Sequence, residues 1–153
     1  MLKKQLTDDL VTAVRNKDKE SINTIRLILA AIKDKEIALR SEDKKKEISE
    51  EIIFNTLKKM IKQRNESIYL YKKGNRPELA DNEKKEICII QKFLPKQLDE
   101  TTVENLCKEI IQRLNVSNMS DIGKVMAELK KNESSSQIDM AKASSCVKII
   151  LNN

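Results

Sequence analysis

Helix-breaking residues are rare in this chain and concentrated in one stretch. The 153 residues include two glycines and two prolines, and three of these four lie between Lys59 and Leu98. There a charged helical pattern meets residues 74–77 (GNRP), resumes, and stops at Leu94 and Pro95. Glycine favours a left-handed helix C-cap, and proline suits the first turn of a helix or the residue just beyond its end. The sequence therefore predicts two helical parts joined near Pro95.

The composition is typical of amphipathic helices with aliphatic interiors. Of the residues, 39% are hydrophobic, 35% are charged and only 3% are aromatic. A chain of this length forms one ordinary domain or two small ones with modest cores. We expect an all-α fold with a helical N-terminal domain of about four helices over residues 1–95 and a small three-helix C-terminal bundle over residues 96–153.

Hydrophobic periodicity predicts where the first two helices lie. The first helix begins at Leu2 and stops near Asn16. The second carries an apolar face over residues 22–32 that is wide enough to touch more than one neighbour. A charge cluster at residues 41–47, with three consecutive lysines, is predicted to be a solvated connection, or alternatively a basic docking patch.

The third and fourth helices have recognisable ends. Ser49 is a plausible N-cap of the third helix, and Ile48 and Ile53 are spaced to form a hydrophobic staple. The fourth helix is predicted to open around Pro77 and to end at Pro95.

Polar residues mark three short helices beyond Pro95. Asp99 and Ser120 are placed to cap the first two, and Ser136 with Asp139 resembles a capping box for the last. Gly123 lies inside the second of these helices, where glycine costs about 1 kcal/mol relative to alanine. We expect close helix packing or, as an alternative, the close approach of a ligand to compensate for that cost, and packing is the preferred interpretation.

The net charge of +6 is unevenly distributed. Residues 1–95 hold 22 Lys and Arg against 16 Asp and Glu, an excess of 22 − 16 = +6, whereas residues 96–153 hold 8 against 8. Six of the 30 basic residues are arginines, which leaves 24 lysines. Lysine is a hydrated point charge without the fork of arginine, so diffuse attraction to phosphates is better supported than reading of bases.

Several kinds of catalytic chemistry are missing from the sequence. There is no histidine, which removes the usual general base near neutral pH and most metal sites. With Gly74 and Gly123 as the two glycines, no glycine-rich phosphate loop can be built. The dispersed carboxylates are expected to form solvated ion pairs, and the three serines at 134–136 a helix-capping linker. We predict no catalytic residue, no metal and no cofactor.

The cysteines and the lack of a long apolar run bear on location. Cys88, Cys107 and Cys146 lie within aliphatic helix patterns and are predicted to be small buried hydrophobes in a reducing compartment. No apolar run approaches the ~20 residues needed to cross a bilayer, and no charged and then apolar leader is present. The sequence therefore predicts a cytoplasmic protein that does not associate with membranes.

Four ordered segments resemble the GatB/YqeY family across nearly the whole chain. They are residues 24–33 (TIRLILAAIK), 61–67 (IKQRNES), 93–98 (FLPKQL) and 119–126 (MSDIGKVM). The resemblance implies a helical N-terminal part followed by a small helical tail. A similar tail ends the B subunit of the glutamine-dependent aspartyl/glutamyl-tRNA amidotransferase, where it approaches the tRNA, and stand-alone members lack the catalytic body of that subunit.

The sequence departs from the family pattern before the last helix. Family members commonly have a glycine-containing turn there, and residues 132–137 (NESSSQ) stand in its place. Serine does not adopt positive φ freely, so this turn is expected either to take another geometry or to be mobile.

Three functions are compatible with these observations. The first is a non-catalytic accessory protein that binds tRNA or a tRNA-charging or tRNA-amidating enzyme. The second, implied by kinship with the larger subunit, is a helper in amidotransfer, a carbon–nitrogen ligation with glutamine as amido donor; alone, the chain is not expected to be an enzyme. The third is a helical protein-interaction module that uses the second helix or a cleft at Pro95.

The candidate nucleic-acid-binding residues are scattered cations. They are Lys62, Arg64, Arg76, Lys96, Lys124, Lys130, Lys131 and Lys142. Lys124, beside Gly123, is the preferred phosphate contact in the tail. Arg64 has a structural alternative, because its position near the apolar face of its helix suits an ion pair whose stem packs on the core. The four aromatic residues are expected in the core or at its rim rather than in a base-stacking surface.

Overall fold

The computed structural model describes residues 1–42 and 47–152, and the lysine run at 44–46 lies outside these residues. Every regular element in the described residues is a helix, which confirms the all-α fold. The chain divides into two compact units, Met1–Leu94 and Pro95–Asn153. Each unit has its own apolar core.

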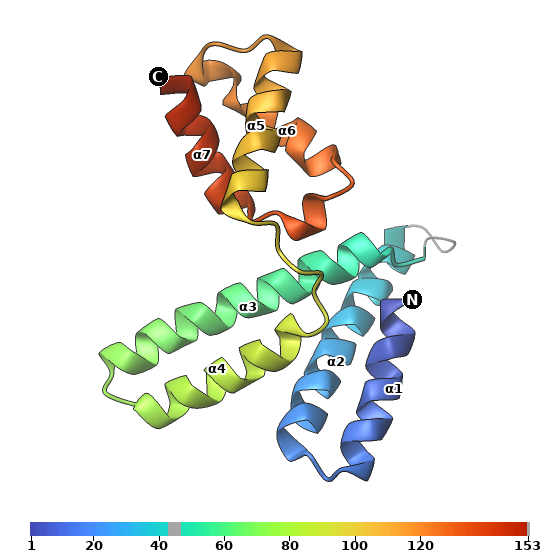
Figure 1. Ribbon diagram of the computed structural model, residues 1–153. Coiled ribbons are helices and arrows are strands. Elements are labelled where there is room, and N and C mark those ends of the chain that lie inside the picture. The colour runs from blue at the N-terminus through green and yellow to red at the C-terminus, as the bar shows by residue number, and fades with distance from the viewer. Residues whose placement is uncertain (43–46, 153) are drawn as a thin grey trace. The chain divides into compact units, whose positions relative to one another are not determined.

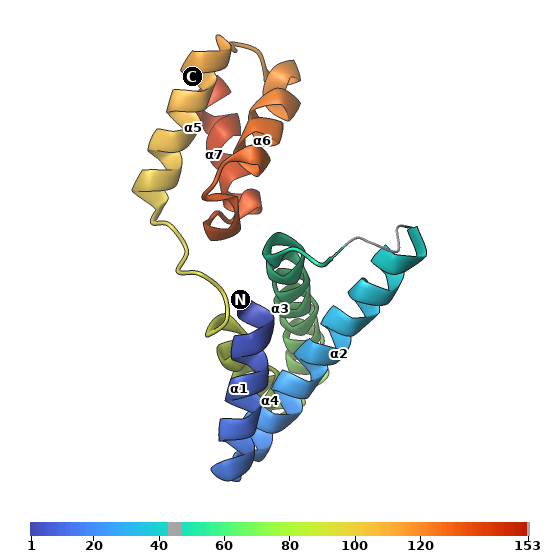
Figure 2. The ribbon, with the colours of Figure 1, turned by 90° about the vertical axis from the view of Figure 1, so that its right-hand side faces the viewer.

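The N-terminal unit is built from two helical hairpins (Figures 1 and 2). The first pairs α1 (Leu2–Arg15) with α2 (Lys19–Glu42), and the second pairs α3 (Glu50–Lys73) with α4 (Pro77–Gln91). α2 also packs against α4. Lys3 of α1 donates a hydrogen bond to the carboxylate of the buried Glu36 on α2, and this bond lowers the pKa of Glu36.

The core of the N-terminal unit lies at one end of the α3–α4 hairpin. α3 contributes Ile53, Leu57 and Met60 from its first half, and α4 and the residues just after it contribute Ile89, Ile90 and Phe93. The rest of this core comes from Leu2, Leu6, Ala13, Ile25, Ile28 and Ile32. The other end of the hairpin extends beyond this core. Ala80, near the start of α4, is buried there but lies outside the cluster.

The structure confirms the N-cap and the hydrophobic staple that the sequence predicts at the start of α3. The Ser49 side chain accepts a hydrogen bond from the backbone N–H of Ile52 at 3.3 Å, so Ser49 is the N-cap. Ile53 is buried in the core, and Ile48 packs against the same cluster, as a hydrophobic staple requires.

The turn after α3 differs from the prediction. Gly74 has φ −84°, and Asn75, at φ 56°, takes the left-handed conformation. The N–H of Asn75 donates to the carbonyl of Lys72, and the N–H of Arg76 to that of Tyr71, the bonding pattern of a Schellman motif. Asparagine adopts this conformation with a smaller energetic penalty than most residues, because its short polar side chain can form local hydrogen bonds. α4 ends at Gln91, four residues earlier than Pro95 would require.

The C-terminal unit is a bundle of three helices with two 3-10 turns. It contains α5 (Glu100–Leu114), η1 (Met119–Asp121), α6 (Ile122–Lys131), η2 (Ser135–Gln137) and α7 (Met140–Asn152). Its buried core is formed by Val103, Cys107, Ile110, Ile111, Val125, Leu129, Ile138, Ala143 and Val147.

One of the three predicted caps in this unit is confirmed. The Asp99 carboxylate accepts a hydrogen bond from the N–H of Thr102 at 2.7 Å, and bonding to Thr102 lowers the pKa of Asp99. Ser120 is not a cap, because it lies within η1. The capping box is also wrong: Ser136 belongs to η2, and Asp139 itself accepts from the first N–H groups of α7.

The segment without glycine before α7 takes another geometry, one of the two predicted outcomes. The Asn132 side chain accepts a hydrogen bond from the N–H of Ser134 at 2.9 Å, and Ser134 has φ −86°. The turn therefore needs no residue at positive φ. Its Gln137 carbonyl accepts from the N–H of Leu98 at 2.9 Å, which fastens the start of the unit to this turn.

Gly123 is exposed in the first turn of α6, and a Cβ built there meets no atom within 4 Å. The expectation of close packing at Gly123 is therefore wrong.

Candidate nucleic-acid interface

The strongest concentration of positive charge in the sequence falls on the last two thirds of α3. Residues 58–73 contain five lysines and Arg64 against the single acid Glu66, a net charge of 6 − 1 = +5. The Lys72 and Lys73 side chains sit in the last helical turn, where positive charge also complements the helix dipole.

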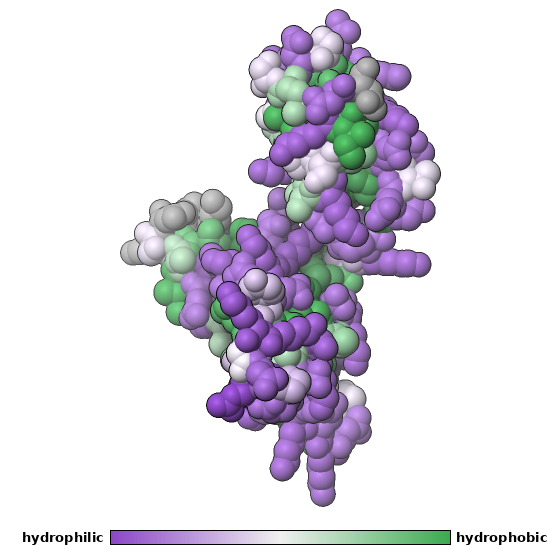
Figure 3. Space-filling model, turned by 90° about the vertical axis from the view of Figure 1, so that its left-hand side faces the viewer, coloured by the Kyte–Doolittle hydropathy of each residue, from purple (hydrophilic) through white to green (hydrophobic). Residues whose placement is uncertain are grey.

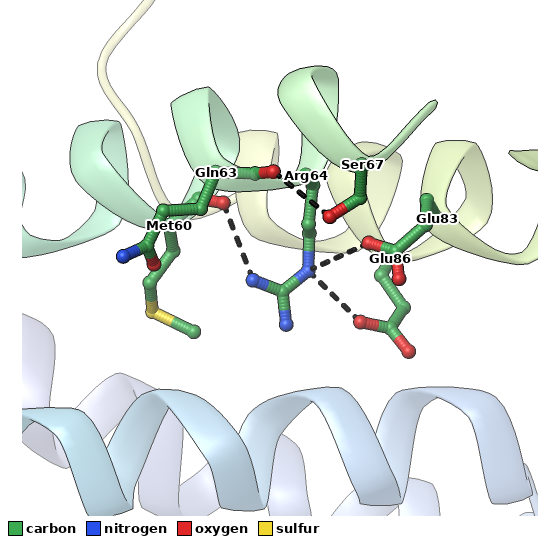
Figure 4. A network of polar contacts seen from close by, with 6 residues as sticks. All are labelled: Met60, Gln63, Arg64, Ser67, Glu83 and Glu86. Atoms are coloured by element: carbon green, nitrogen blue, oxygen red, sulfur yellow. Dashed lines mark hydrogen bonds and ion pairs between the residues drawn. The ribbon is translucent and has the colours of Figure 1, made fainter. Parts of the chain in front are cut away.

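Arg64 faces α4 and is bound within the hairpin (Figure 4). Its Nε donates to a Glu86 carboxylate oxygen at 2.8 Å and lies 4.0 Å from a Glu83 oxygen. Its Nη1 donates to the Met60 carbonyl at 3.2 Å. The side chain is only 13% exposed. The predicted structural ion pair is thus confirmed, and a nucleic-acid role for Arg64 stays a prediction.

The two carboxylates beside Arg64 are not equivalent. Burial, with a further contribution from the Glu86 carboxylate, raises the pKa of Glu83 above its ordinary value. Arg64 opposes this shift because its positive charge stabilises the ionised form. Arg64 therefore offsets the electrostatic repulsion between two neighbouring carboxylates that are both partly buried.

Lys62 and Lys73 of the same helix point away from this site. Successive residues of an α-helix are rotated by about 100°, so Lys62 lies about 200° round the helix from Arg64. Lys62, Lys72 and Lys73 are exposed and make no ion pair within the described residues. Figure 3 shows one face of the molecule, on which hydrophilic side chains dominate. α3 thus separates a structural arginine from a lysine-rich outer face.

Arg76 and Lys96, two further candidates, lie outside helices. Arg76 precedes α4 and its guanidinium is 3.9 Å from the exposed Glu78 carboxylate. Lys96 is exposed in the segment that leads to α5.

Most of the tail candidates have a carboxylate close by. Lys124 is 2.9 Å from Asp121, Lys131 is 3.8 Å from Glu128, and Lys142 is 3.6 Å from Glu100. Lys130 is exposed and, among the described residues, has no such partner. The neighbouring acids reduce the potential that a phosphate would meet at the tail.

The exposure of Tyr69 differs from the prediction for the aromatic residues. Phe93 is buried and Phe54 and Tyr71 are partly buried, as expected, but Tyr69 is 67% exposed on α3. The signal was in the spacing, because Tyr69 follows Lys62 by seven residues, or two helical turns, and so shares its face.

Comparison of the sequence with models of known protein families identifies the family of this chain. Residues 3–151 match the family model described as Yqey-like protein. The chain belongs to this family. Relatives of the Yqey-like chain include a protein of Vanderwaltozyma polyspora named Altered inheritance of mitochondria protein 41, mitochondrial, which is 34% identical over 76% of this chain and 64% of its own length. Proteins of the same name from Saccharomyces cerevisiae and Pyrenophora tritici-repentis are 34% and 27% identical, over 82% of this chain and 62% and 70% of theirs.

The match spans less than two thirds of several relatives, for example 45% of the Kluyveromyces lactis protein. These relatives are named as mitochondrial proteins, which contradicts the cytoplasmic expectation. That expectation rested on the lack of an apolar segment, whereas mitochondrial transit peptides are amphipathic and need none. Within the described residues, no helix of the Yqey-like chain has the length and apolarity to span a membrane.

The cysteines differ in environment. Cys107 is buried and Cys146 partly buried, but Cys88 is exposed, so the prediction of three buried thiols is wrong for Cys88. Burial, together with the nearby Cys146 thiol, raises the pKa of Cys107 to about 11. In the described part of the chain, no three acidic, cysteine or histidine residues gather as metal ligands.

Proposed function

We propose that this Yqey-like protein is a non-catalytic accessory protein that binds RNA, with tRNA as the first candidate. The observation that carries the proposal is the net charge of +5 over residues 58–73, on a helix whose single arginine is turned toward α4. Lysines that lack carboxylate partners, here Lys62, Lys72 and Lys73, release counterions when they meet phosphates, which is the main source of RNA affinity. The family's kinship with the amidotransferase tail supports tRNA as the RNA.

The expected binding is electrostatic and depends steeply on salt. About four lysine–phosphate contacts would give a slope of log affinity against log salt of about −3. Because the outer face of α3 offers lysines and no arginine, we expect little discrimination between sequences. The names of the fungal relatives make mitochondrial tRNAs one of the RNA sets to include.

The test compares two charge-matched variants of the full chain. Lys62→Glu with Lys73→Glu alters α3, and Lys124→Glu with Lys130→Glu alters the tail; each pair changes the net charge from +6 to 6 − 4 = +2. Anisotropy of labelled tRNA is measured from about 50 mM to about 200 mM salt. We expect the α3 pair to lose at least tenfold in affinity and to flatten the salt slope, and the tail pair to lose much less.

Two results would contradict the proposal in different ways. A larger loss in the tail pair would move the site to the Lys124 region that the resemblance implies. Absence of binding by the unaltered chain at about 50 mM salt would remove RNA as the partner. The hypothesis of a partner protein would then take its place, and the exposed Leu27 and Ile37 of α2 are where a helix would be sought.

A further inference from the structure

The outer face of α3 presents an aromatic ring between positive charges. Its members recur at helical spacing, and they are Lys62, Asn65, Tyr69, Lys72 and Lys73. At about 100° per residue they cover about 100° of the helix circumference, and at 1.5 Å per residue they extend over about 17 Å. All five are exposed. We call this set the α3 lysine–tyrosine face.

Among the described residues, the Tyr69 ring belongs to no apolar core. It lies in the half of α3 beyond the apolar core, and its hydroxyl makes no hydrogen bond within the described residues. The position is about 140° round the helix from Arg64, so the ring points away from the Arg64–Glu86 ion pair. A flat ring that is two thirds exposed offers an area on which another flat ring can stack.

The charges around Tyr69 favour an anionic partner on both sides of the ring. Lys62 lies two turns before it, and Lys72 and Lys73 lie one turn after it. Glu66, three residues before Tyr69, is the one acid in this stretch of α3, and it leaves the sum at 3 − 1 = +2 for these four ionised groups. Phosphate groups on either side of a stacked base match this order of charge, ring and charge.

We propose that the α3 lysine–tyrosine face binds an unpaired nucleotide, with the base stacked on Tyr69 and the flanking phosphates on Lys62, Lys72 and Lys73. This inference rests on the proposed RNA-binding function and narrows it to single-stranded segments such as loops. Bases inside a duplex hide their faces and cannot stack on a side chain, whereas every unpaired base has a free face. The face carries no arginine fork, so stacking rather than hydrogen bonding selects the ligand, and the site tolerates different base sequences.

The experiment uses the full chain and two RNA probes with equal numbers of phosphates, a single-stranded oligouridine and a perfectly paired hairpin. Both are measured by anisotropy at about 50 mM salt. We expect the unaltered protein to prefer the single strand. Tyr69→Ala should weaken single-strand binding by about five- to a hundredfold and leave hairpin binding unchanged. Tyr69→Phe should retain it.

Leu70→Ala is the matched control. Leu70 is also exposed and adjacent in sequence, but it lies about 100° round the helix from Tyr69. A second readout follows from the composition, because the chain has two tyrosines and no tryptophan. In a Tyr71→Phe variant all tyrosine fluorescence comes from Tyr69, and stacking of a base should quench it.

The possible outcomes distinguish the stacking site from RNA binding as a whole. If both probes bind equally and Tyr69→Ala changes nothing, the stacking site is refuted while RNA binding stands. If Leu70→Ala weakens the single strand as much as Tyr69→Ala, the site is also refuted, because loss of any exposed side chain would then suffice. If neither probe nor tRNA binds the unaltered protein, the proposed function fails together with this inference.

Discussion

Replacing Arg64 with leucine should destabilise the N-terminal unit by about 2 kcal/mol at pH 7. Truncating one partner of a fully buried ion pair costs about 3–5 kcal/mol, and an exposed pair contributes about 0–1 kcal/mol. The Arg64 and Glu86 side chains are 13% and 33% exposed, which places this pair between those limits. The substitution also removes the hydrogen bond to the Met60 carbonyl.

The loss should depend on pH in a definite direction. Without the guanidinium, Glu83 and Glu86 face each other in a half-buried site, and the pKa of Glu83 rises further above its ordinary value of about 4.5. A carboxyl whose folded pKa is raised binds more protons when folded, so stability is lost as pH rises through that folded pKa. The deficit of Arg64→Leu should therefore be largest near neutral pH and shrink as pH falls through the raised folded-state pKa of Glu83.

Urea unfolding followed by tyrosine fluorescence measures the stability of the N-terminal unit, to which Arg64 belongs. Both tyrosines lie on α3 and the chain has no tryptophan, so the signal reports the N-terminal unit alone. Lys62→Leu, on the opposite side of the same helix, is the control and should change stability by less than about 0.5 kcal/mol. A deficit of Arg64→Leu no larger than that of the control, or one that does not vary between about pH 4 and about pH 7, would refute the structural role of Arg64.

Three further substitutions or reactions have definite expected outcomes. The Thr24 hydroxyl is buried without a hydrogen-bond partner in the described residues, so Thr24→Val should stabilise the N-terminal unit by about 1 kcal/mol in the same urea assay; destabilisation would mean that a bound water satisfies it. Gly123→Ala should stabilise the tail by about 0.5–1 kcal/mol in thermal unfolding followed by circular dichroism, and no gain would show that glycine is needed there. With a thiol reagent at pH 8, Cys88 should react first and Cys107 last, since its pKa is about 11; equal rates for both would show that Cys107 is accessible.

The sequence predicted features that depend on neighbours a few residues away. The caps Ser49 and Asp99 were found because each side chain bonds to an N–H group three residues later. The sequence predicts the left-handed residue at Gly74, but the structure has it at Asn75, since both residues tolerate that conformation and the choice depends on where the last hydrogen bond of α3 falls. Cys88 was misjudged within an apolar run, because one residue of any such run must face outward on a helix packed on one side.

The candidate interface could be predicted only in part, because it depends on contacts between residues that are far apart in the sequence. Lys62 was identified from charge alone, and its exposure agrees with that choice. The outward direction of Tyr69 is fixed by contacts between α3 and α4, such as the Arg64–Glu86 pair, whose members are 22 residues apart. Periodicity within one helix gives relative directions, but a distant partner decides which direction points to solvent.

The position of the apolar core at one end of the α3–α4 hairpin implies a gradient of local stability along α3. Amide hydrogens near Leu57, in the core, should exchange with solvent only through global opening, whereas those near Tyr69 should exchange through fraying of the free end. A ligand seated on that end would have to order it, and part of the binding free energy would be lost as conformational entropy. Occupation of the lysine–tyrosine face would then appear as slowed amide exchange at the far end of the hairpin, without any change in its average backbone structure.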